Sequence, residues 1–572
     1  MYPTFYDDFY GAVPKLRLDG DAWMVFALAL LLQWLAWEPG INIYDEGIIL
    51  SGADAVYSGL LPYRDFWTMV APGQFYLTAL LFHLFEPQEY LVRCIGLVSK
   101  AAIAMLAWVM MRRFLGKLPA ALGAAALLLT LTIIHYEAFP VYPATACAML
   151  ALLLMERGIC LVRRRPLFLA GLCTALAACF RHDLGFYTAV ALAAGATALW
   201  RMQHPQDSWL DIGKNLGAYA AGILLVGVPV AAFFLVKVPL HDLVENLIRI
   251  PATGYTHTRR LEWPGFGTFG QFLSEIQQGG SVFHSSIGYA FAFSVYIPFI
   301  IAISALAAAV IGLRRNKRDK LGAAPAAPFL LLASILCLLL AIKGLVRVNP
   351  VHMVQSLALA VPIALIFMRH LQPLPWATKA LACAPAAVAC ALMVLMGTAG
   401  ALDVYYGTRE LFSENNFFTR CKNPVSPRLR CVKAISPETE RYALLAHFLQ
   451  QNTAPHETVY VGAGRHDRIE QNGVLLYFMA ARLPATKWAA LHPGVQTSAD
   501  IQQRMIEDMR RMPPRFLVLD SAWDENAADA PEGARLLDEW LAECHAEAAR
   551  IETVRILAPR ADEGGRCGSP AP

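Results

Sequence analysis

Long apolar runs separated by short charged segments dominate the first 400 residues of the chain. A helix needs about 20 apolar residues to cross a hydrocarbon core of ~30 Å, and short cytoplasmic loops collect Lys and Arg. Lys15 and Arg17 therefore place the N-terminus on the cytoplasmic side. With alternating sides, the pattern predicts eleven spans, at residues 22–37, 90–111, 118–134, 143–159, 166–180, 184–200, 216–236, 287–311, 326–341, 351–367 and 376–396.

The apolar segment 73–85 is too short to be a twelfth span. Its 13 residues would extend only ~20 Å as a helix. If it crossed, Arg112, Arg113 and Lys117 would lie outside, against the distribution of basic residues in membrane proteins. We therefore expect an interfacial helix within a first outer loop, 38–89, and a second large outer loop at 238–286.

Residues 401–572, which we call the tail, differ from the transmembrane domain, residues 1–400. The tail contains no apolar run long enough to span a membrane, and strand-like pieces alternate in it with helical ones. Such alternation predicts a soluble α/β domain, here on the outer face. Ser436 and Pro437 are a typical N-cap and first-turn pair for a helix to about residue 451. The remaining expected elements are helices 473–481, 498–511 and 532–546, and strands 458–461, 515–519 and 553–557.

Composition agrees with a polytopic α-helical membrane protein, since 57% of the residues are hydrophobic and only 16% are charged. The net charge of +4 is too small to indicate nucleic-acid binding. Residues 1–20 are polar and aromatic, so we expect a retained first helix rather than a cleavable signal. Eight of the twelve cysteines lie in or at spans as small core residues; the tail cysteines could form disulfides outside, and Cys421–Cys431 is the favoured pair. No cysteine or histidine spacing indicates a metal site.

Mixed charges collect at the outer ends of the predicted spans, whereas the inner ends carry basic residues almost alone. Each of these side chains could be a helix anchor or a snorkelling group. Their convergence on one face instead favours a polar substrate cavity. The candidates are Asp45, Glu46, Arg64, Asp65, His135, Glu137, Arg181, His182, Asp183, Lys343, Arg347 and His352, with His257, Arg259 and Arg260 in the second outer loop.

Several short motifs in this chain resemble the GT-C membrane glycosyltransferases, most closely the bacterial branch of aminoarabinose transferases and protein O-mannosyltransferases. The tail's Leu476–Thr486 stretch and its Leu491-His492-Pro493-Gly494 sequence are similar to the outer domain of that group. The other motifs are Tyr44-Asp45-Glu46-Gly47, Gly59-x-x-Pro62-Tyr63-Arg64-Asp65-Phe66, Ala71-Pro72-Gly73-Gln74-Phe75-Tyr76 and Arg112-Arg113-Phe114-Leu115-Gly116.

The resemblance implies transfer of a sugar from a polyprenyl-phosphate carrier to an acceptor hydroxyl on a glycan, lipid or protein, at the outer face of the bacterial cytoplasmic membrane. It gives Asp45 the position of the base, with Glu46 as its orienter or alternative. For the leaving phosphate we expect Lys343 and Arg347, assisted by Arg64 or Arg181, because fixed cations stabilise developing negative charge, and His352 could donate to the same phosphate. The loop 238–286 resembles a mobile segment that closes over the carrier, although an ordered structural loop is an equal alternative.

Two other functional classes are compatible with the sequence. A transporter or flippase would also be polytopic, but its polar residues usually lie near the bilayer midplane and its halves repeat. A non-catalytic envelope assembly protein would explain the tail but not the acidic pair Asp45 and Glu46. No organic cofactor is expected. Asp45, Glu46 and Asp65 could hold a divalent cation, which we do not predict. The turn Gly462-Ala463-Gly464 is weak support for a phosphate site, and a plain strand–helix connection is favoured.

Overall fold

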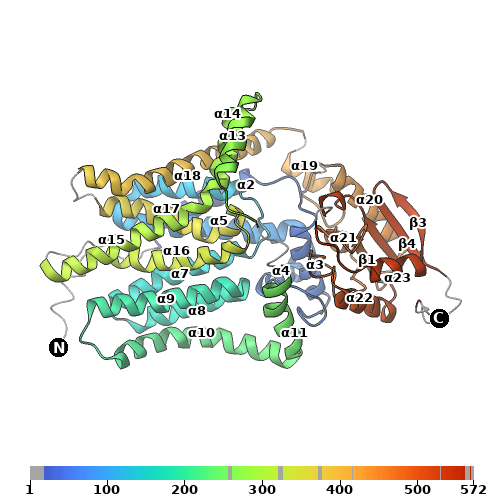
Figure 1. Ribbon diagram of the computed structural model, residues 1–572, viewed down its shortest axis with the longest axis horizontal. Helices are drawn as coiled ribbons and strands as arrows, with labels where there is room; N and C mark the ends of the chain where they lie inside the picture. Colours follow the sequence, from blue (N-terminus) through green and yellow to red (C-terminus); the bar gives the residue numbers. More distant parts are fainter. Residues whose placement is uncertain are drawn as a thin grey trace. The chain divides into compact units, whose positions relative to one another are not determined.

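The computed structural model describes residues 18–255, 261–319, 326–371, 376–414, 416–433, 436–527, 530–560 and 567. The chain forms two compact units (Figure 1). The helical unit comprises residues 1–37, 95–231 and 261–409. The mixed unit comprises residues 38–94, 232–260 and 410–572, so the first outer loop and the tail belong to the same compact body.

Long apolar helices build the helical unit, as the hydropathy pattern predicts. Three of them, α5, α10 and α18, have one end within the residue ranges of the mixed unit. The elements are α2 (Gly20–Leu35), α5 (Glu89–Leu115), α6 (Lys117–Thr132), α7 (Val141–Cys160), α8 (Arg164–Phe180), α9 (His182–Gln203), α10 (Trp209–Lys237), α13 (Phe266–Gln277), α14 (Val282–Phe293), η3 (Ser294–Tyr296), α15 (Ile297–Asp319), α16 (Ala327–Lys343), η4 (Gly344–Val346), α17 (Pro350–His370) and α18 (Trp376–Glu410).

Every one of the eleven predicted spans coincides with helix, which confirms a mostly helical chain. Within the described ranges, seven helical segments are both long and apolar enough to cross a membrane. Three shorter apolar helices, among them α2 and α6, accompany them. The third is α4 (Gly73–Phe85), whose bounds equal those expected for the interfacial helix. The number of crossings stays a prediction.

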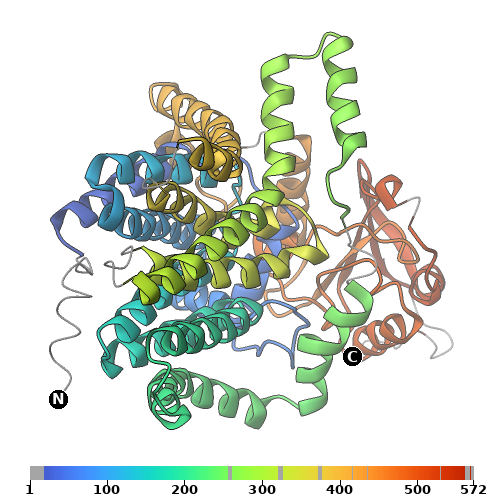
Figure 2. The same cartoon turned by 60° about the vertical axis from the view of Figure 1, so that its left-hand side comes forward.

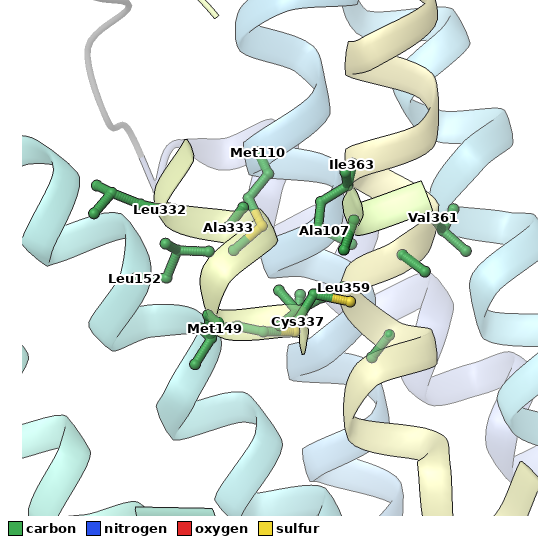
Figure 3. Packing of buried hydrophobic residues seen from close by; sticks show 14 of the residues in the cluster. Ala107, Met110, Met149, Leu152, Leu332, Ala333, Cys337, Leu359, Val361 and Ile363 are labelled. Atoms are coloured by element: carbon green, nitrogen blue, oxygen red, sulfur yellow. The ribbon is translucent and has the colours of Figure 1, made fainter. Parts of the chain in front are cut away.

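The core of the helical unit is a continuous apolar cluster to which α5, α7, α16 and α17 contribute the residues labelled in Figure 3, together with residues of α6, α8, α9, α15 and α18. Met149, Leu332 and Cys337 are buried in it. Small residues let neighbouring helices approach closely. A Cβ at Gly171 of α8 would overlap the carbonyl oxygen of Tyr219 in α10, and a Cβ at Gly222 would overlap that of Phe168. These two glycines therefore fix the α8–α10 contact.

Residues 238–286, which we predict to be the second outer loop, contain more regular structure than their residue pattern indicates. The helices of this segment are α11 (Leu240–Val244), the π-helical turns η1 (Glu245–Arg249) and η2 (Pro251–Tyr255), α13, and the start of α14. α13 and α14 form an antiparallel hairpin (Figure 2). Glu275 of α13 accepts a hydrogen bond from the Ser285 hydroxyl of α14, at 3.1 Å, which joins the two arms. His257, Arg259 and Arg260 lie outside the described residues.

The mixed unit combines helices of the first loop with a small sheet from the tail. The sheet order is β1-β2-β4-β3, with β1 parallel to β2 and the other pairs antiparallel. Its elements are α3 (Asp45–Tyr57), α4, α11, η1, η2, α19 (Phe417–Lys422), α20 (Pro437–Asn452), β1 (Val459–Ala463), α21 (Leu475–Ala480), α22 (Ala499–Arg511), β2 (Phe516–Asp520), η5 (Glu525–Ala527), α23 (Leu536–Cys544), β3 (His545–Ile551) and β4 (Val554–Pro559).

The expected helix 532–546 is wrong at both ends. α23 is shorter, and residues from His545 onward form the edge strand β3. Ala and Glu in this stretch favour helix by propensity, but pairing with β4 overrides that preference. The favoured disulfide Cys421–Cys431 is present, and Cys544 is bonded to Cys567.

Candidate functional site

The sequence-predicted acidic pair opens helix α3 in the mixed unit. Asn42 fixes the approach to the helix, since its Oδ1 accepts the backbone N–H groups of Tyr44 and Asp45 at 3.0 and 2.6 Å. Asp45 and Glu46 occupy the first turn, where the helix dipole favours negative charge. Asp45 is half-buried, while Glu46 is buried. The two neighbouring carboxylates thus have different environments.

Glu46 is held by a buried arginine at the start of α5. Arg93 donates from Nε and Nη2 to the two carboxylate oxygens, at 2.8 and 2.7 Å. Arg93 also donates to the carbonyl oxygens of Glu38 and Gly40, and the Glu46 carboxylate accepts the Asn42 N–H at 3.0 Å. This network joins the chain before α3 to α5. The hydrogen bonds also hold the Glu46 side chain in a fixed position next to Asp45 in sequence.

The start of α3 also packs against the tail, at Leu475 and at the Leu491-His492 motif. A Cβ at Gly47 would lie 2.6 Å from the backbone nitrogen of Leu475, which donates to the Ile43 carbonyl oxygen at 3.0 Å. Tyr44 donates its hydroxyl to the Leu491 carbonyl oxygen at 2.7 Å, and that hydroxyl lies 2.9 Å from Nδ1 of His492. The glycine after the acidic pair is therefore required for close backbone approach.

Arg64 and Asp65 form an ion pair with each other. Arg64 donates from Nε and Nη2 to the Asp65 oxygens at 2.7 and 2.8 Å, and Asp65 also accepts the Leu61 N–H at 2.8 Å. Burial alone would raise the pKa of Asp65, but these hydrogen bonds outweigh it and hold the pKa below its ordinary value. Trp67 connects this turn to the tail, because its backbone N–H donates to the Lys487 carbonyl oxygen at 2.8 Å.

The predicted phosphate-binding cations meet in the helical unit. At the α8–α9 turn, Arg181 donates from Nε and Nη2 to Asp183 at 3.0 and 2.6 Å. Lys343, at the end of α16, donates to the His352 carbonyl oxygen at 3.4 Å. Arg181, Asp183 and Arg347 interact electrostatically with Lys343, and both arginines also interact with His352. Three basic side chains, Arg181, Lys343 and Arg347, therefore lie near one another and near Asp183.

His135 and Glu137 are brought together with a lysine that the sequence analysis did not select. Lys100 of α5 is fully buried and donates to Glu137 Oε1 at 2.9 Å and to the His135 carbonyl oxygen at 3.1 Å. Tyr142 donates its hydroxyl to the same carbonyl at 2.6 Å. A Cβ at Gly96 would overlap the Glu137 carbonyl oxygen. These contacts tie the α6–α7 turn to α5.

Two residues that organise the site were therefore missed, Arg93 and Lys100. Both are cations within a predicted apolar span, seven residues apart and so on one face of a helix. Charges inside a span usually have a partner. That signal was present in the sequence, but the identity of each partner was not.

One group of possible metal ligands occurs among the described residues, namely His241, Asp242 and Glu245, whose ligand atoms lie within 4.8 Å of one another. Basic side chains already neutralise it. Lys487 lies 3.0 Å from Asp242, and Arg504 lies 3.1 Å from Glu245. Asp65 and Glu46 likewise form ion pairs, with Arg64 and Arg93 respectively. We therefore assign no metal ion to these carboxylates.

Comparison with known proteins gives a likeness in structure. No family model matches the chain, and no curated protein matches it. ArnT from Cupriavidus metallidurans bound to undecaprenyl phosphate matches with a TM-score of 0.53 at 14% identity, covering 97% of this chain and 100% of that chain. ArnT from the same organism in the apo state matches with a TM-score of 0.53 at 15% identity, covering 94% and 98%. ArnT is a GT-C superfamily glycosyltransferase, and the chain has the fold that its motifs predicted.

Proposed function

We propose that the chain is an integral membrane glycosyltransferase that moves a sugar from a polyprenyl-phosphate carrier to an acceptor hydroxyl. The observation that carries the proposal is the fold likeness to ArnT over 97% of the chain. The ArnT crystal structure contains undecaprenyl phosphate, a carrier of the proposed chemical class. The charges of the described residues suit the reaction, because a carboxylate opens α3 and cations gather around Lys343.

In the proposed reaction the acceptor oxygen forms a bond to the anomeric carbon of the donor sugar. The bond between that carbon and the phosphate oxygen breaks, and the polyprenyl phosphate leaves with the electron pair. Asp45 takes the acceptor proton, and Glu46 stays bound to Arg93 and braces the start of α3. Lys343, Arg347 and Arg181 stabilise the negative charge that develops on the phosphate. Direct displacement predicts inversion at the anomeric carbon.

The proposed location is the cytoplasmic membrane of a bacterium, with the N-terminus inside and the tail outside. Lys15, Arg17 and the basic ends of the spans support this orientation. The two disulfides of the tail, Cys421–Cys431 and Cys544–Cys567, support it independently, because disulfides persist in oxidising compartments outside the cytoplasm. The acceptor would then be a glycan, lipid or protein of the cell envelope.

Replacement of Asp45 by Asn tests the proposal. The change removes the base with almost no change of shape, and a positioned base contributes roughly 10²–10⁴ in rate. The assay follows sugar transfer in isolated membranes of a deletion strain that carries each variant, with the lipid-linked donor pool radiolabelled beforehand. Glu86→Gln is the matched control, since Glu86 is an exposed acid of the same loop.

We expect transfer to fall at least a hundredfold in Asp45→Asn and to stay at the wild-type rate in Glu86→Gln. Full transfer by Asp45→Asn, at equal protein level, would remove Asp45 from the mechanism. Equal envelope glycans in the wild-type and deletion strains would remove the glycosyltransferase assignment itself. Retained anomeric configuration in the product would exclude a single displacement.

A further inference from the structure

The tail domain contains an open cavity of about 680 Å³. Gly464, in the turn that follows β1, lines it together with Leu519 of β2 and Arg555 of β4. Leu519 and Arg555 pair directly across the sheet, so their side chains lie on one face. α23 adds Asp538 to the lining. The lining also includes Leu557 of β4 and His545 of β3, so the cavity extends from the carboxyl end of β1 and β2 to the start of β3.

Most of the charges around the cavity are already paired. Arg465 and Arg535 both contact Asp467, which is almost fully buried. Asp538 accepts hydrogen bonds from the backbone N–H of His466, at 2.8 Å, and lies 2.7 Å from its ring Nδ1. Glu547 of β3, on the same lining, accepts two hydrogen bonds from Arg550, at 2.9 and 2.8 Å.

Arg555 and Arg560 are the exceptions. Arg555 donates to the Gly464 carbonyl oxygen at 3.2 Å, and Glu547 interacts with it electrostatically without a hydrogen bond between them among the described atoms. Arg560 is exposed, and within the described part of the chain its guanidinium contacts no carboxylate. Two guanidinium groups thus face one cavity without a dedicated anion. Such groups bind phosphate or carboxylate through paired N–H donors.

A buried histidine also belongs to the lining of the cavity. His545 is 94% buried, and its ring packs edge-on against Trp540 at 4.9 Å between centroids. Its Nδ1 has no hydrogen-bond partner in the described structure. That nitrogen is itself covered, and the ring interacts with the backbone of Leu541, so His545 forms part of the wall without offering a contact to a bound molecule.

We propose that this cavity binds a sugar that carries a phosphate or a carboxylate, with Arg555 and Arg560 holding the anionic group and the leucines of the lining packing against the sugar ring. The volume fits a small molecule, for which pockets of about 300–1,000 Å³ are usual. Leu519, Leu541 and Leu557 give the lining an apolar part against which a sugar ring can pack. This site goes beyond the proposed transfer reaction and does not rest on it, because binding needs no lipid-linked donor.

Isothermal titration calorimetry of the purified full-length chain in detergent tests the proposal. The probes are glucose 6-phosphate, glucuronate, inorganic phosphate and glucose, so that the source of the anion is resolved. We expect saturable binding of at least one anionic sugar, at least tenfold tighter than glucose or inorganic phosphate. Arg560→Gln should weaken that binding about tenfold, and Arg555→Gln combined with Arg560→Gln should weaken it further.

Arg515→Gln is the matched control, because Arg515 is an exposed arginine of the same domain outside the cavity lining. Its binding should equal that of the wild type. Arg560→Gln leaves the Arg555–Gly464 hydrogen bond in place. We therefore expect this variant to stay folded, so that weaker binding by it reports the loss of the guanidinium group. Equal affinity for glucose, equal affinity for inorganic phosphate, unchanged affinity in the double variant, or no saturable binding would each overturn the proposal.

Discussion

Replacement of Glu46 by Gln should destabilise the mixed unit strongly, because it removes the counter-charge of Arg93. The two side chains are only 6% and 1% exposed. Removing one partner of a buried ion pair typically costs about 3–5 kcal/mol, since the other charge stays buried and uncompensated. Arg93 keeps two carbonyl acceptors, those of Glu38 and Gly40, so we expect the lower end, about 3 kcal/mol.

Thermal unfolding of the purified protein in detergent measures this cost. At roughly 2–4 °C per kcal/mol for a unit of this size, the midpoint should fall by about 6–12 °C. Adding Arg93→Gln to Glu46→Gln should cost less than the sum of the single changes, with a coupling of at least about 1.5 kcal/mol. The exposed Glu86→Gln serves as control. Additive effects, or a midpoint within ~2 °C of the wild type, would refute the bracing role of Glu46.

Three further outcomes follow from the same structure. Lys100→Met should cost about 3–5 kcal/mol by leaving Glu137 buried without its cation, and adding Glu137→Gln should recover part of that loss in the same unfolding measurement. Replacing Cys421 and Cys431 by Ser should cost about 2–3 kcal/mol, because the bridge closes a ten-residue separation; an unchanged midpoint, with the bridge verified by mass in the wild type, would contradict this. Burial lowers the pKa of His545 from 6.5 to about 4; a hydrogen bond with the Leu541 backbone opposes this shift and Arg560 adds to it, so the folded tail holds this ring neutral near pH 7. Stability from this group is complete above pH 6.5 and is lost as the pH falls toward 4, by about 1–2 kcal/mol at pH 5. His545→Gln should flatten that part of the unfolding profile, and an identical profile in the variant would exclude His545 as its cause.

The positions of the helices were predictable because membrane crossing imposes a length and a composition that a sequence displays directly. Segment 73–85 became α4 with the same bounds, although its interfacial placement stays a prediction. Strand β3 was not predictable from its own residues. It is an edge strand with mostly exposed side chains, and its only strong cause is the neighbouring β4, which local propensity does not reveal.

The candidate site was predictable in its residue types but not in its pairings. Asp45 stands out by its position after an apolar span, and the cations near Lys343 stand out by their place at span ends. Arg93 and Lys100 escaped notice because a single cation in a long apolar run changes hydropathy little. Their carboxylate partners lie 47 and 37 positions away in sequence, respectively. Such distances are set by tertiary packing, which residue patterns do not encode locally.

The contact between α3 and the tail has a practical consequence for anyone who builds hybrids of this protein with others of the same fold. Gly47 and Leu475 touch backbone to backbone, and Tyr44 is bonded to residues 491 and 492. A chimeric protein with a foreign tail and the native N-terminal loop would combine two surfaces that are not complementary. Exchange should succeed only when both segments come from the same protein.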